Sequence, residues 1–302
     1  MPIHLPPLSR REFLGKAILA GAGVALTHCT PAKRPAADSD LWALLADTHI
    51  AEDRATVARG INMTDHLIAV GGQVARADGI AGVIIAGDCA YLQGMAGDYS
   101  TVLGLLEPMR AAGLPIHLLL GNHDARDNFR AAIQKNGESA DSPVADKHVA
   151  LLKTPRANFF LLDSLDQTNV TPGRIGEAQL SWLAGALDAN TDRPAIIIAH
   201  HHPELYGVKN GAVDTPALMD LLVPRKHVKA YVFGHTHVWG TLPHESGIHL
   251  VNLPPVAYVF KQGLISGWVS AALRDGGATL TLRSTDGMHP DEGKAFDLEW
   301  RA

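Results

Sequence analysis

The chain has 302 residues, of which 46% are apolar and 19% are charged, a composition typical of a globular protein. Residues 1–39 hold five basic and two acidic side chains, a net of +3, so the formal charge of −5 for the whole chain leaves −8 on the remainder. An acidic surface repels the phosphate backbone of nucleic acids. The charge therefore argues against a nucleic-acid polymer as partner, whereas a small phosphorylated substrate stays compatible with it.

The first 39 residues have the features of an export signal followed by a polar tether. Arg10 and Arg11 precede Phe13-Leu14, and a run of small apolar residues follows at 17–26. Ten residues are too few to span a bilayer, which needs about 20. The paired arginines predict the twin-arginine export machinery as a partner and a periplasmic or other extracytoplasmic location. An amphipathic N-terminal helix is the alternative interpretation.

Two cysteines occur in the chain, Cys29 and Cys89. Leu26-Thr27-His28-Cys29 loosely resembles a lipoprotein cleavage site, although the bulky His28 stands where a small residue is usual, so a lipid anchor on Cys29 is a secondary possibility. Otherwise the signal predicts only a transient contact with the membrane. Because Cys29 lies in the signal, a structural disulfide is not expected. We expect the folded domain to comprise residues 40–302.

Short apolar runs alternate with helical patterns along this domain. Apolar runs that predict strands buried on both faces occupy residues 41–46, 83–86, 116–120, 195–199 and 228–233. Apolar residues at helical spacing predict helices at 56–76, 101–112, 177–187 and 216–222. Further strands are predicted at 248–253, 268–273 and 278–282. Strands that alternate with helices predict an α/β layered fold.

Each of the first five apolar runs ends in polar residues able to bind a metal. These segments are Asp47-Thr48-His49, Gly87-Asp88, Gly121-Asn122-His123-Asp124, His200-His201-His202-Pro203 and Gly234-His235-Thr236-His237. In open α/β sheets, ligand sites form beyond the carboxyl ends of the strands, so the five segments are expected to meet. Mixed imidazole and carboxylate ligands favour Fe, Mn or Zn over Mg or Ca. The absence of cysteine argues against a structural zinc site.

These segments, together with a Gly-x-x-Gln-x-x-Trp-Leu pattern at 176–183, resemble the calcineurin-like metallophosphoesterase superfamily over roughly residues 41–285. Within it the chain is most similar to the bacterial class III cyclic-nucleotide phosphodiesterases. The resemblance implies a four-layer α-β-β-α sandwich. It also implies hydrolysis of phosphate esters, diesters rather than monoesters, by a hydroxide that bridges two divalent or trivalent transition-metal ions.

The resemblance assigns roles to individual residues. Asp47, His49 and His237 would hold the first metal, Asn122, His201 and His235 the second, and Asp88 would bridge them. His123 would stabilise the transition state or protonate the leaving oxygen, and Asp124 would orient nearby groups. Asn122 and His123 would also contact the substrate.

The fourth segment departs from the family pattern, because three histidines precede Pro203 where two are usual. Counting back from Pro203 selects His201 as the ligand. His200 would then end the buried strand, and His202 would lie beside the substrate or behind the ligands. Arg126 is expected either to bind a phosphate oxygen or to form an ordinary ion pair.

Other functions are also compatible with parts of the sequence. An arginase-type hydrolase is disfavoured, because it would require an Asp-x-His-x-Asp segment and Ala51 stands at the last position. A non-catalytic scaffold with this fold, or a phosphate-binding protein, is the alternative from a different class. Cyclic nucleotides, glycerophosphodiesters and simple monoesters all remain open as substrates.

Overall fold

The computed structural model describes residues 4–5, 40–137 and 139–302. The predicted export signal and its Cys29 therefore lie outside the described residues, apart from the short strand β1 (His4–Leu5). No helix of the described part is long and apolar enough to cross a membrane.

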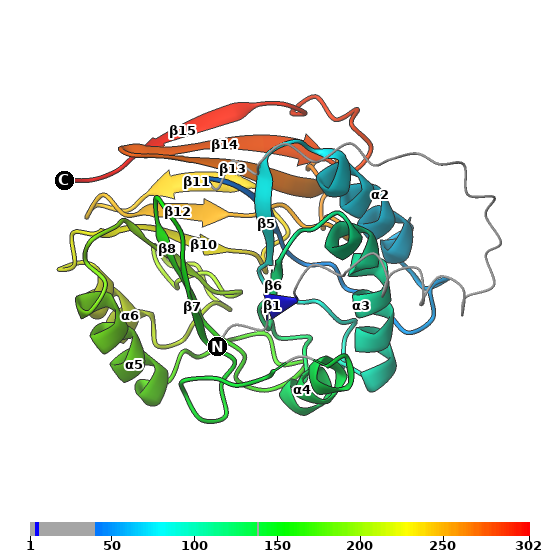
Figure 1. The fold of residues 1–302 in the computed structure, drawn as a ribbon, viewed down its shortest axis with the longest axis horizontal. Coiled ribbons are helices and arrows are strands. Elements are labelled where there is room, and N and C mark those ends of the chain that lie inside the picture. Colours follow the sequence, from blue (N-terminus) through cyan, green and yellow to red (C-terminus); the bar gives the residue numbers. More distant parts are fainter. Residues whose placement is uncertain (1–3, 6–39, 138) are drawn as a thin grey trace.

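Two sheets form the centre of the molecule (Figure 1). The first contains, in spatial order, β1, β6 (Ile116–Leu118), β5 (Ile80–Ile85), β2 (Leu41–Leu45), β13 (Gly267–Arg274), β14 (Gly277–Ser284) and β15 (Ala295–Glu299). The second contains β11 (Gly240–Pro243), β12 (His249–Asn252), β10 (Val228–Phe233), β9 (Ala195–Ile198), β8 (Asn158–Leu161) and β7 (Ala150–Lys153).

The middle strands of each sheet run parallel. In the first sheet β2 pairs with β5 and β5 with β6, and in the second β8, β9, β10 and β12 pair in succession. The inner faces of the two sheets pack on each other through Trp42, Phe159 and Val269, among other buried side chains. Because parallel strands end at the same edge, residues that follow β2, β5, β6, β9 and β10 are brought together.

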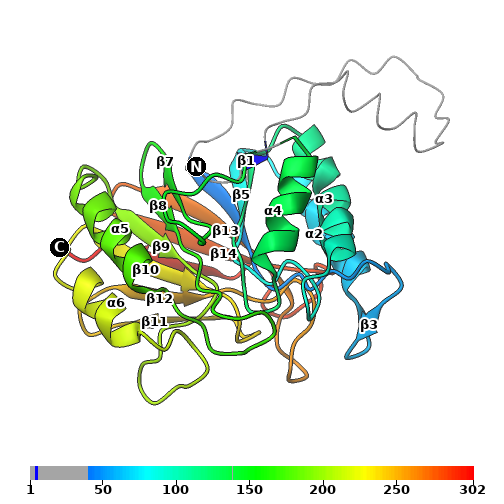
Figure 2. The same ribbon diagram turned by 90° about the horizontal axis from the view of Figure 1, so that it is seen from below.

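Helices cover the outer face of each sheet (Figure 2). The helices α2 (Met63–Arg76), α3 (Ala96–Ala111) and α4 (Arg126–Lys135) lie on the first sheet, where Leu67, Leu106 and Phe129 are fully buried. The helices α5 (Glu177–Asp188) and α6 (Thr215–Leu222) lie on the second, where Leu183 and Leu218 are fully buried. The predicted four-layer α-β-β-α sandwich is therefore confirmed.

The main local difference from the sequence prediction concerns residues 56–76. Only Met63–Arg76 is helical, because the side chain of Asn62 caps the helix by accepting from the backbone N–H of Asp65. The preceding residues form a small hairpin of β3 (Val57–Ala58) and β4 (Ile61–Asn62), which turns through Arg59 and Gly60 in left-handed conformations.

Candidate metal centre

Two buried carboxylates form the base of the site. Asp47 follows β2 and Asp88 follows β5, and their side chains are 0% and 2% exposed. Burial on its own would raise the pKa of both carboxyls. Neighbouring histidines outweigh it, so that His237 lowers the pKa of Asp47 and His200 holds that of Asp88 well below its ordinary value. Both groups are therefore ionised, as metal ligands must be.

Two imidazoles converge on Asp47. The Nε2 atoms of His49 and His237 lie 3.0 Å apart, at 3.9 Å and 3.4 Å from the Asp47 Oδ1 atom. His237 donates its Nδ1–H to the Tyr258 carbonyl, which fixes the ring and leaves Nε2 directed at the carboxylate. His49 Nε2 is also 3.7 Å from Asp88 Oδ2, so the two carboxylates share this histidine. Asp47, His49 and His237 thus offer three donor atoms within 4.8 Å of one another.

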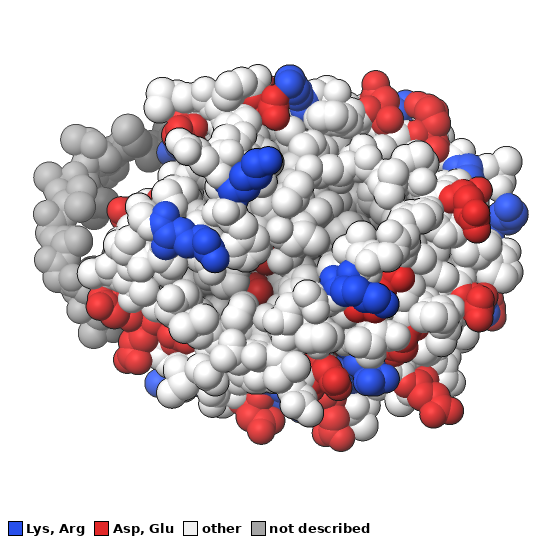
Figure 3. Space-filling model, turned by 180° about the vertical axis from the view of Figure 1, so that it is seen from behind, with Lys and Arg blue, Asp and Glu red and all other residues white. Residues whose placement is uncertain are grey.

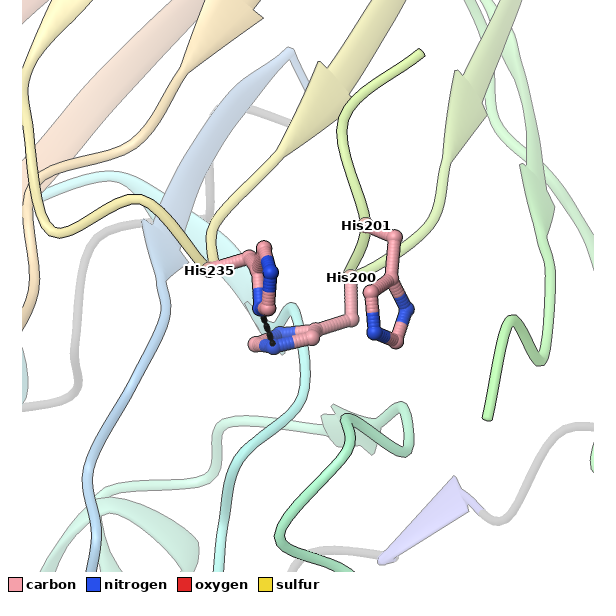
Figure 4. Close-up of side chains that lie close together, drawn as sticks. All are labelled: His200, His201 and His235. Carbon is pink, nitrogen blue, oxygen red and sulfur yellow. Dashed lines mark hydrogen bonds between the residues drawn. The ribbon is translucent and has the colours of Figure 1, made fainter. Parts of the chain in front are cut away.

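A second group of imidazoles comprises His200, His201 and His235, whose rings lie close together (Figure 4). His200 Nε2 is 3.3 Å from Asp88 Oδ2 and 3.2 Å from His235 Nδ1, while His200 Nδ1 donates to the Ala86 carbonyl. Burial opposes protonation of His200, but Asp88 raises its pKa to about 9. Burial lowers the pKa of His235 to about 4, which keeps that ring neutral. One donor atom each from Asp47, Asp88 and His200 lies within 4.8 Å of the other two.

His201, the ligand expected from the sequence, offers a ring nitrogen within 4.8 Å of donor atoms of His200 and His235. His201 Nδ1 lies 2.8 Å from the Ser164 hydroxyl and its Nε2 lies 3.0 Å from the carbonyl of Thr171, a residue that lines the pocket beside the ligands. The rings of His200 and His201 are perpendicular, and it is the His200 Nε2 atom that lies 3.3 Å from Asp88 Oδ2. His201 nevertheless packs 4.6 Å from His235 between ring centroids.

Asn122 and His123 follow β6 and reach the same edge. Asn122 is 3% exposed, and its Oδ1 atom has no hydrogen-bond partner among the described residues. The backbone N–H of His123 donates to Asp88 Oδ1 at 2.8 Å, and its Nδ1 donates to the Leu92 carbonyl at 3.0 Å. This buried amide oxygen has no hydrogen-bond partner among the described residues and lies beside two carboxylates and several imidazoles, so it is available to bind a cation. The donor set therefore fits metal binding.

Glycines in the motifs make room for the carboxylates. A Cβ atom on Gly121 would come within 2.2 Å of Asp88 Oδ1, and one on Gly234 within 2.5 Å of Asp47 Oδ2. Any other residue at these two positions would displace the ligand oxygens. The glycines of the Gly-Asn-His-Asp and Gly-His-x-His segments are therefore required by the close approach of backbone to carboxylate.

The backbone of the site is strained at the ligand positions. Asp47, His49, Asp88, His235 and His237 all have left-handed conformations, with φ between 47° and 70°. Non-glycine residues avoid this region because of a steric cost of order 1–3 kcal/mol each. Such residues persist where the surrounding structure enforces them, and they cluster at functional sites.

The donor atoms open into a pocket of about 410 Å³. Its walls include Thr171, His202, Lys209, Tyr258 and Phe260. The Phe260 ring stacks on His237 at 4.3 Å between centroids, and the Arg59 guanidinium lies 4.7 Å from the centre of the Phe260 ring. Figure 3 shows a hollow on this side of the molecule, with acidic atoms in its floor and basic side chains on both sides.

The remaining predicted site residues occupy different positions. Asp124 is fully buried and accepts from the N–H groups of Cys89, Ala90 and Gly121, so it holds the loops that carry Asp88 and Asn122. Burial and the nearby Asp88 raise the pKa of Asp124 to about 6. His202 lines the pocket, as expected.

Arg126 does not line this pocket. Its Nε and Nη2 atoms lie 2.7 Å and 2.9 Å from the two carboxylate oxygens of Asp163, which is 0% exposed. The bidentate pair satisfies a buried charge and directs the guanidinium away from the metal ligands. Of the two alternatives expected for Arg126, the structure shows the ion pair.

Sequence reasoning missed several residues that shape the site. Ser164 follows β8 and fixes His201, while Tyr258 and Phe260 come from a loop after β12. The signal for Ser164 was a further apolar run, 159–162, that also ends in polar residues, Asp163 and Ser164. Nothing in the local sequence distinguishes Tyr258 and Phe260 from core aromatics.

Comparison with known proteins agrees with this geometry. The calcineurin-like phosphoesterase family model matches residues 43–239, and the chain belongs to this family. It is a metallophosphoesterase, a hydrolase of phosphoric esters with candidate ligands for metal ions.

Among curated relatives, the chain is 29% identical over 209 residues to the 3′,5′-cyclic adenosine monophosphate phosphodiesterase CpdA of Pseudomonas aeruginosa, covering 67% of this chain and 72% of that protein. It is 27% identical over 167 residues to a probable cyclic nucleotide phosphodiesterase of Psychrobacter, covering 53% of this chain and about half, 48%, of the relative's length. Among solved structures, a dimetal phosphatase of Danio rerio superposes with a TM-score of 0.66 at 17% identity, over 87% of this chain and 99% of that one. The structural likeness supports the fold.

Proposed function

We propose that this protein hydrolyses small phosphate esters, diesters in preference to monoesters, with two transition-metal ions of the Fe, Mn or Zn type. Asp47, His49 and His237 would hold one ion. Asn122, His200 and His235 would hold the other, with Asp88 between them. The observation that carries this proposal is the overlap of the donor groups, because Asp88 shares a cluster with His49 and His123 and another with Asp47 and His200.

The choice of His200 instead of His201 as ligand rests on the hydrogen bonds of the two rings. The Nε2 atom of His200 lies 3.3 Å from Asp88 Oδ2, whereas the nitrogens of His201 are directed at Ser164 and Thr171. His201 is then a positioning residue that packs against His235.

Two bound cations would supply positive charge to the phosphoryl oxygens and acidify a water molecule. The protein's own residues orient the substrate and handle the proton of the leaving group. His123 donates its Nδ1–H to the Leu92 carbonyl, so its Nε2 is the atom free to carry a proton to the leaving oxygen. The backbone N–H of His123 donates to Asp88 Oδ1. This bond couples the position of His123, the proton donor, to that of Asp88, the ligand proposed to lie between the two metals.

The proposed preference for diesters rests on likeness to the curated relatives, and the preference for small substrates rests on the size of the pocket. The two curated relatives named above are a cyclic adenosine monophosphate phosphodiesterase and a probable cyclic nucleotide phosphodiesterase. A pocket of about 410 Å³ has the dimensions of small-molecule sites rather than of a polymer groove.

The test combines metal analysis with a substrate panel. The purified protein, loaded separately with Fe, Mn or Zn, should contain about two ions per chain and cleave bis(p-nitrophenyl) phosphate faster than p-nitrophenyl phosphate. Cyclic nucleotides and glycerophosphodiesters complete the panel. A preparation that binds no metal and cleaves none of these esters would identify a scaffold, and phosphate binding without turnover would identify a phosphate-binding protein.

We also propose export by the twin-arginine route, supported by Arg10 and Arg11 before a short apolar run. Cell fractionation should place the wild-type protein outside the cytoplasm, and replacement of both arginines by lysine should retain it inside. Export that is unchanged by this double substitution would contradict the proposal. Labelling with a fatty-acid analogue tests the lipid anchor at Cys29, with Cys29→Ala as control.

A further inference from the structure

A second cavity adjoins the metal pocket on the outer face of the second sheet. It measures about 250 Å³ and lies between the loop that follows β9 and the strands β10, β11 and β12. Its lining is mainly apolar and includes Leu205, Tyr206, Phe233, Trp239, Leu242 and Leu250. Leu242 is 50% exposed and Tyr206 is 65% exposed, so large apolar side chains here remain open to solvent.

The cavity adjoins the metal pocket. His202, Val208 and Thr236 line both. The His202 centroid lies 5.6 Å from that of His235 and 6.1 Å from that of Phe233. A ligand whose phosphorus lies at the metal ligands can therefore place a ring against Phe233, provided that several bonds separate the two.

The cavity also contains a polar atom without a partner. Asn252 donates its side-chain N–H to Thr236 Oγ1, and its buried Oδ1 has no hydrogen-bond partner among the described residues. A ligand N–H or O–H group that reaches this oxygen beside the cavity would satisfy it, and an unsatisfied buried polar atom is costly.

We propose that this cavity binds an uncharged aryl group of the ester, joined to phosphorus through a short flexible linker and carrying a hydrogen-bond donor. This inference rests on the proposed function, since it takes the phosphorus to lie at the metal ligands. It assigns substrate specificity to Phe233, Trp239 and Leu242, which take no part in metal binding. The cavity recognises the organic part of the ester by apolar contact.

Calorimetry with phosphonates, which are not hydrolysed, tests the cavity apart from turnover. The metal-loaded protein should bind 4-phenylbutylphosphonate roughly 10–100-fold more tightly than methylphosphonate, as expected for burial of one phenyl ring. A p-hydroxyl group on that ring should add a roughly three- to tenfold gain by donating to Asn252 Oδ1. Equal affinity for the first two would overturn the proposal, and no gain from the hydroxyl would remove its hydrogen-bond part.

Gly240 allows a substitution that fills the cavity. It shares a strand face with Leu242, and a Cβ atom built on it meets nothing within 4 Å. Gly240→Leu should bring the two affinities to within about threefold of each other and leave methylphosphonate binding unchanged. Gly104→Leu, on α3 and equally unobstructed, is the matched control and should keep the wild-type ratio.

If Gly240→Leu fails to fold, Leu242→Asp places a charge in the same cavity on a half-exposed edge strand, with Met288→Asp as its exposed control. A wild-type ratio in the folded Leu242→Asp variant would contradict the proposal. The outcomes separate the two hypotheses. Cleavage of diesters without a preference for the aryl phosphonate refutes only the aryl-binding role of the cavity. If the metal-loaded protein neither binds phosphonates nor cleaves esters, both this role and the proposed function are refuted.

Discussion

The two halves of the sandwich contribute different chemistry to their common edge. The first sheet supplies both carboxylates, Asp47 and Asp88, together with Asn122 and the imidazoles of His49 and His123. The second sheet supplies imidazoles alone, among them His200 and His235. Either sheet by itself would bury its polar groups without the complementary groups of the other sheet. The comparison indicates that a metal centre at this edge would take its ligands from both sheets, and that cations bound there would link the two sheets.

Asp88→Ala tests the contribution of the first half most severely. The variant loses the carboxylate that lies within reach of both His49 and His200. We expect turnover to fall by roughly three orders of magnitude or more, and metal content to fall with it. Near-normal kcat with two metals per chain would contradict the assignment.

The adjacent histidines of the second half sharpen the comparison. His200→Ala removes the ring that faces Asp88 and should lower kcat/KM by roughly 10²–10³-fold. His201→Ala removes a ring that packs on His235 and bonds to Ser164 and Thr171, and should cost roughly tenfold. Steady-state kinetics and metal content of both variants decide the matter. The reverse order would restore His201 as the ligand.

Metal removal tests whether cations link the halves. At a metal concentration about 100-fold above Kd, binding to the folded state alone stabilises it by about 2.7 kcal/mol. For a chain of this size that corresponds to a fall in Tm of roughly 5–10 °C on chelation. Thermal unfolding with and without chelator measures the shift, and Asp88→Ala serves as the control that should respond less. A Tm unaffected by chelation would show that the halves need no cation.

Arg126 and Asp163 form a second link between the halves, without metal. Arg126 begins α4 over the first sheet, and Asp163 follows β8 of the second. Arg126→Ala leaves a buried carboxylate unpaired and should destabilise the protein by about 3 kcal/mol. KM should stay near the wild-type value, because Arg126 lies outside the metal pocket. Denaturant unfolding and kinetics distinguish this from a substrate contact, which would raise KM at unchanged stability.

His148 forms a third link, and it depends on pH. Its Nε2–H donates to the Leu118 carbonyl at the end of β6, and burial lowers its pKa to about 4. The unfolded chain takes up the proton near pH 6.5, so the stability contributed by neutral His148 is complete above that pH and is lost as pH falls toward 4. At pH 5 the loss should be about 2 kcal/mol.

His148→Gln keeps a side-chain N–H for the same carbonyl and does not titrate. Its free energy of unfolding should therefore fall less steeply between pH 6.5 and 5 than that of the wild type. Equal slopes would show that His148 makes no contribution of its own.

The sequence predicted those parts of the molecule in which local pattern and burial agree. The apolar run 228–233 is a strand with those bounds, and 195–199 differs by one residue. Both strands lie in the middle of a sheet, where each face is buried. The edge strands β11 and β15 were missed, because their exposed residues break the apolar run. The helix α4 was missed because only Phe129 and Ile133 are buried in it.

The choice between His200 and His201 shows a limit of a different kind. Both histidines are fully buried and adjacent, so composition and spacing do not separate them. The difference depends on which ring meets the Ser164 hydroxyl, and Ser164 is 37 residues away from His201. Likewise the pairing of Arg126 depends on Asp163, in another half of the fold. Contacts of this kind become visible only when the two sheets are placed together.

A left-handed backbone lowers the stability of the fold at five residues that are proposed to bind metal, namely Asp47, His49, Asp88, His235 and His237. Glycine adopts this conformation without the steric cost that these residues bear. A lineage freed from selection for turnover would gain stability by drifting to glycine at any of the five positions, at the expense of metal binding. Aspartate and histidine at these five positions therefore supply donor groups at a cost in backbone stability that glycine would not bear.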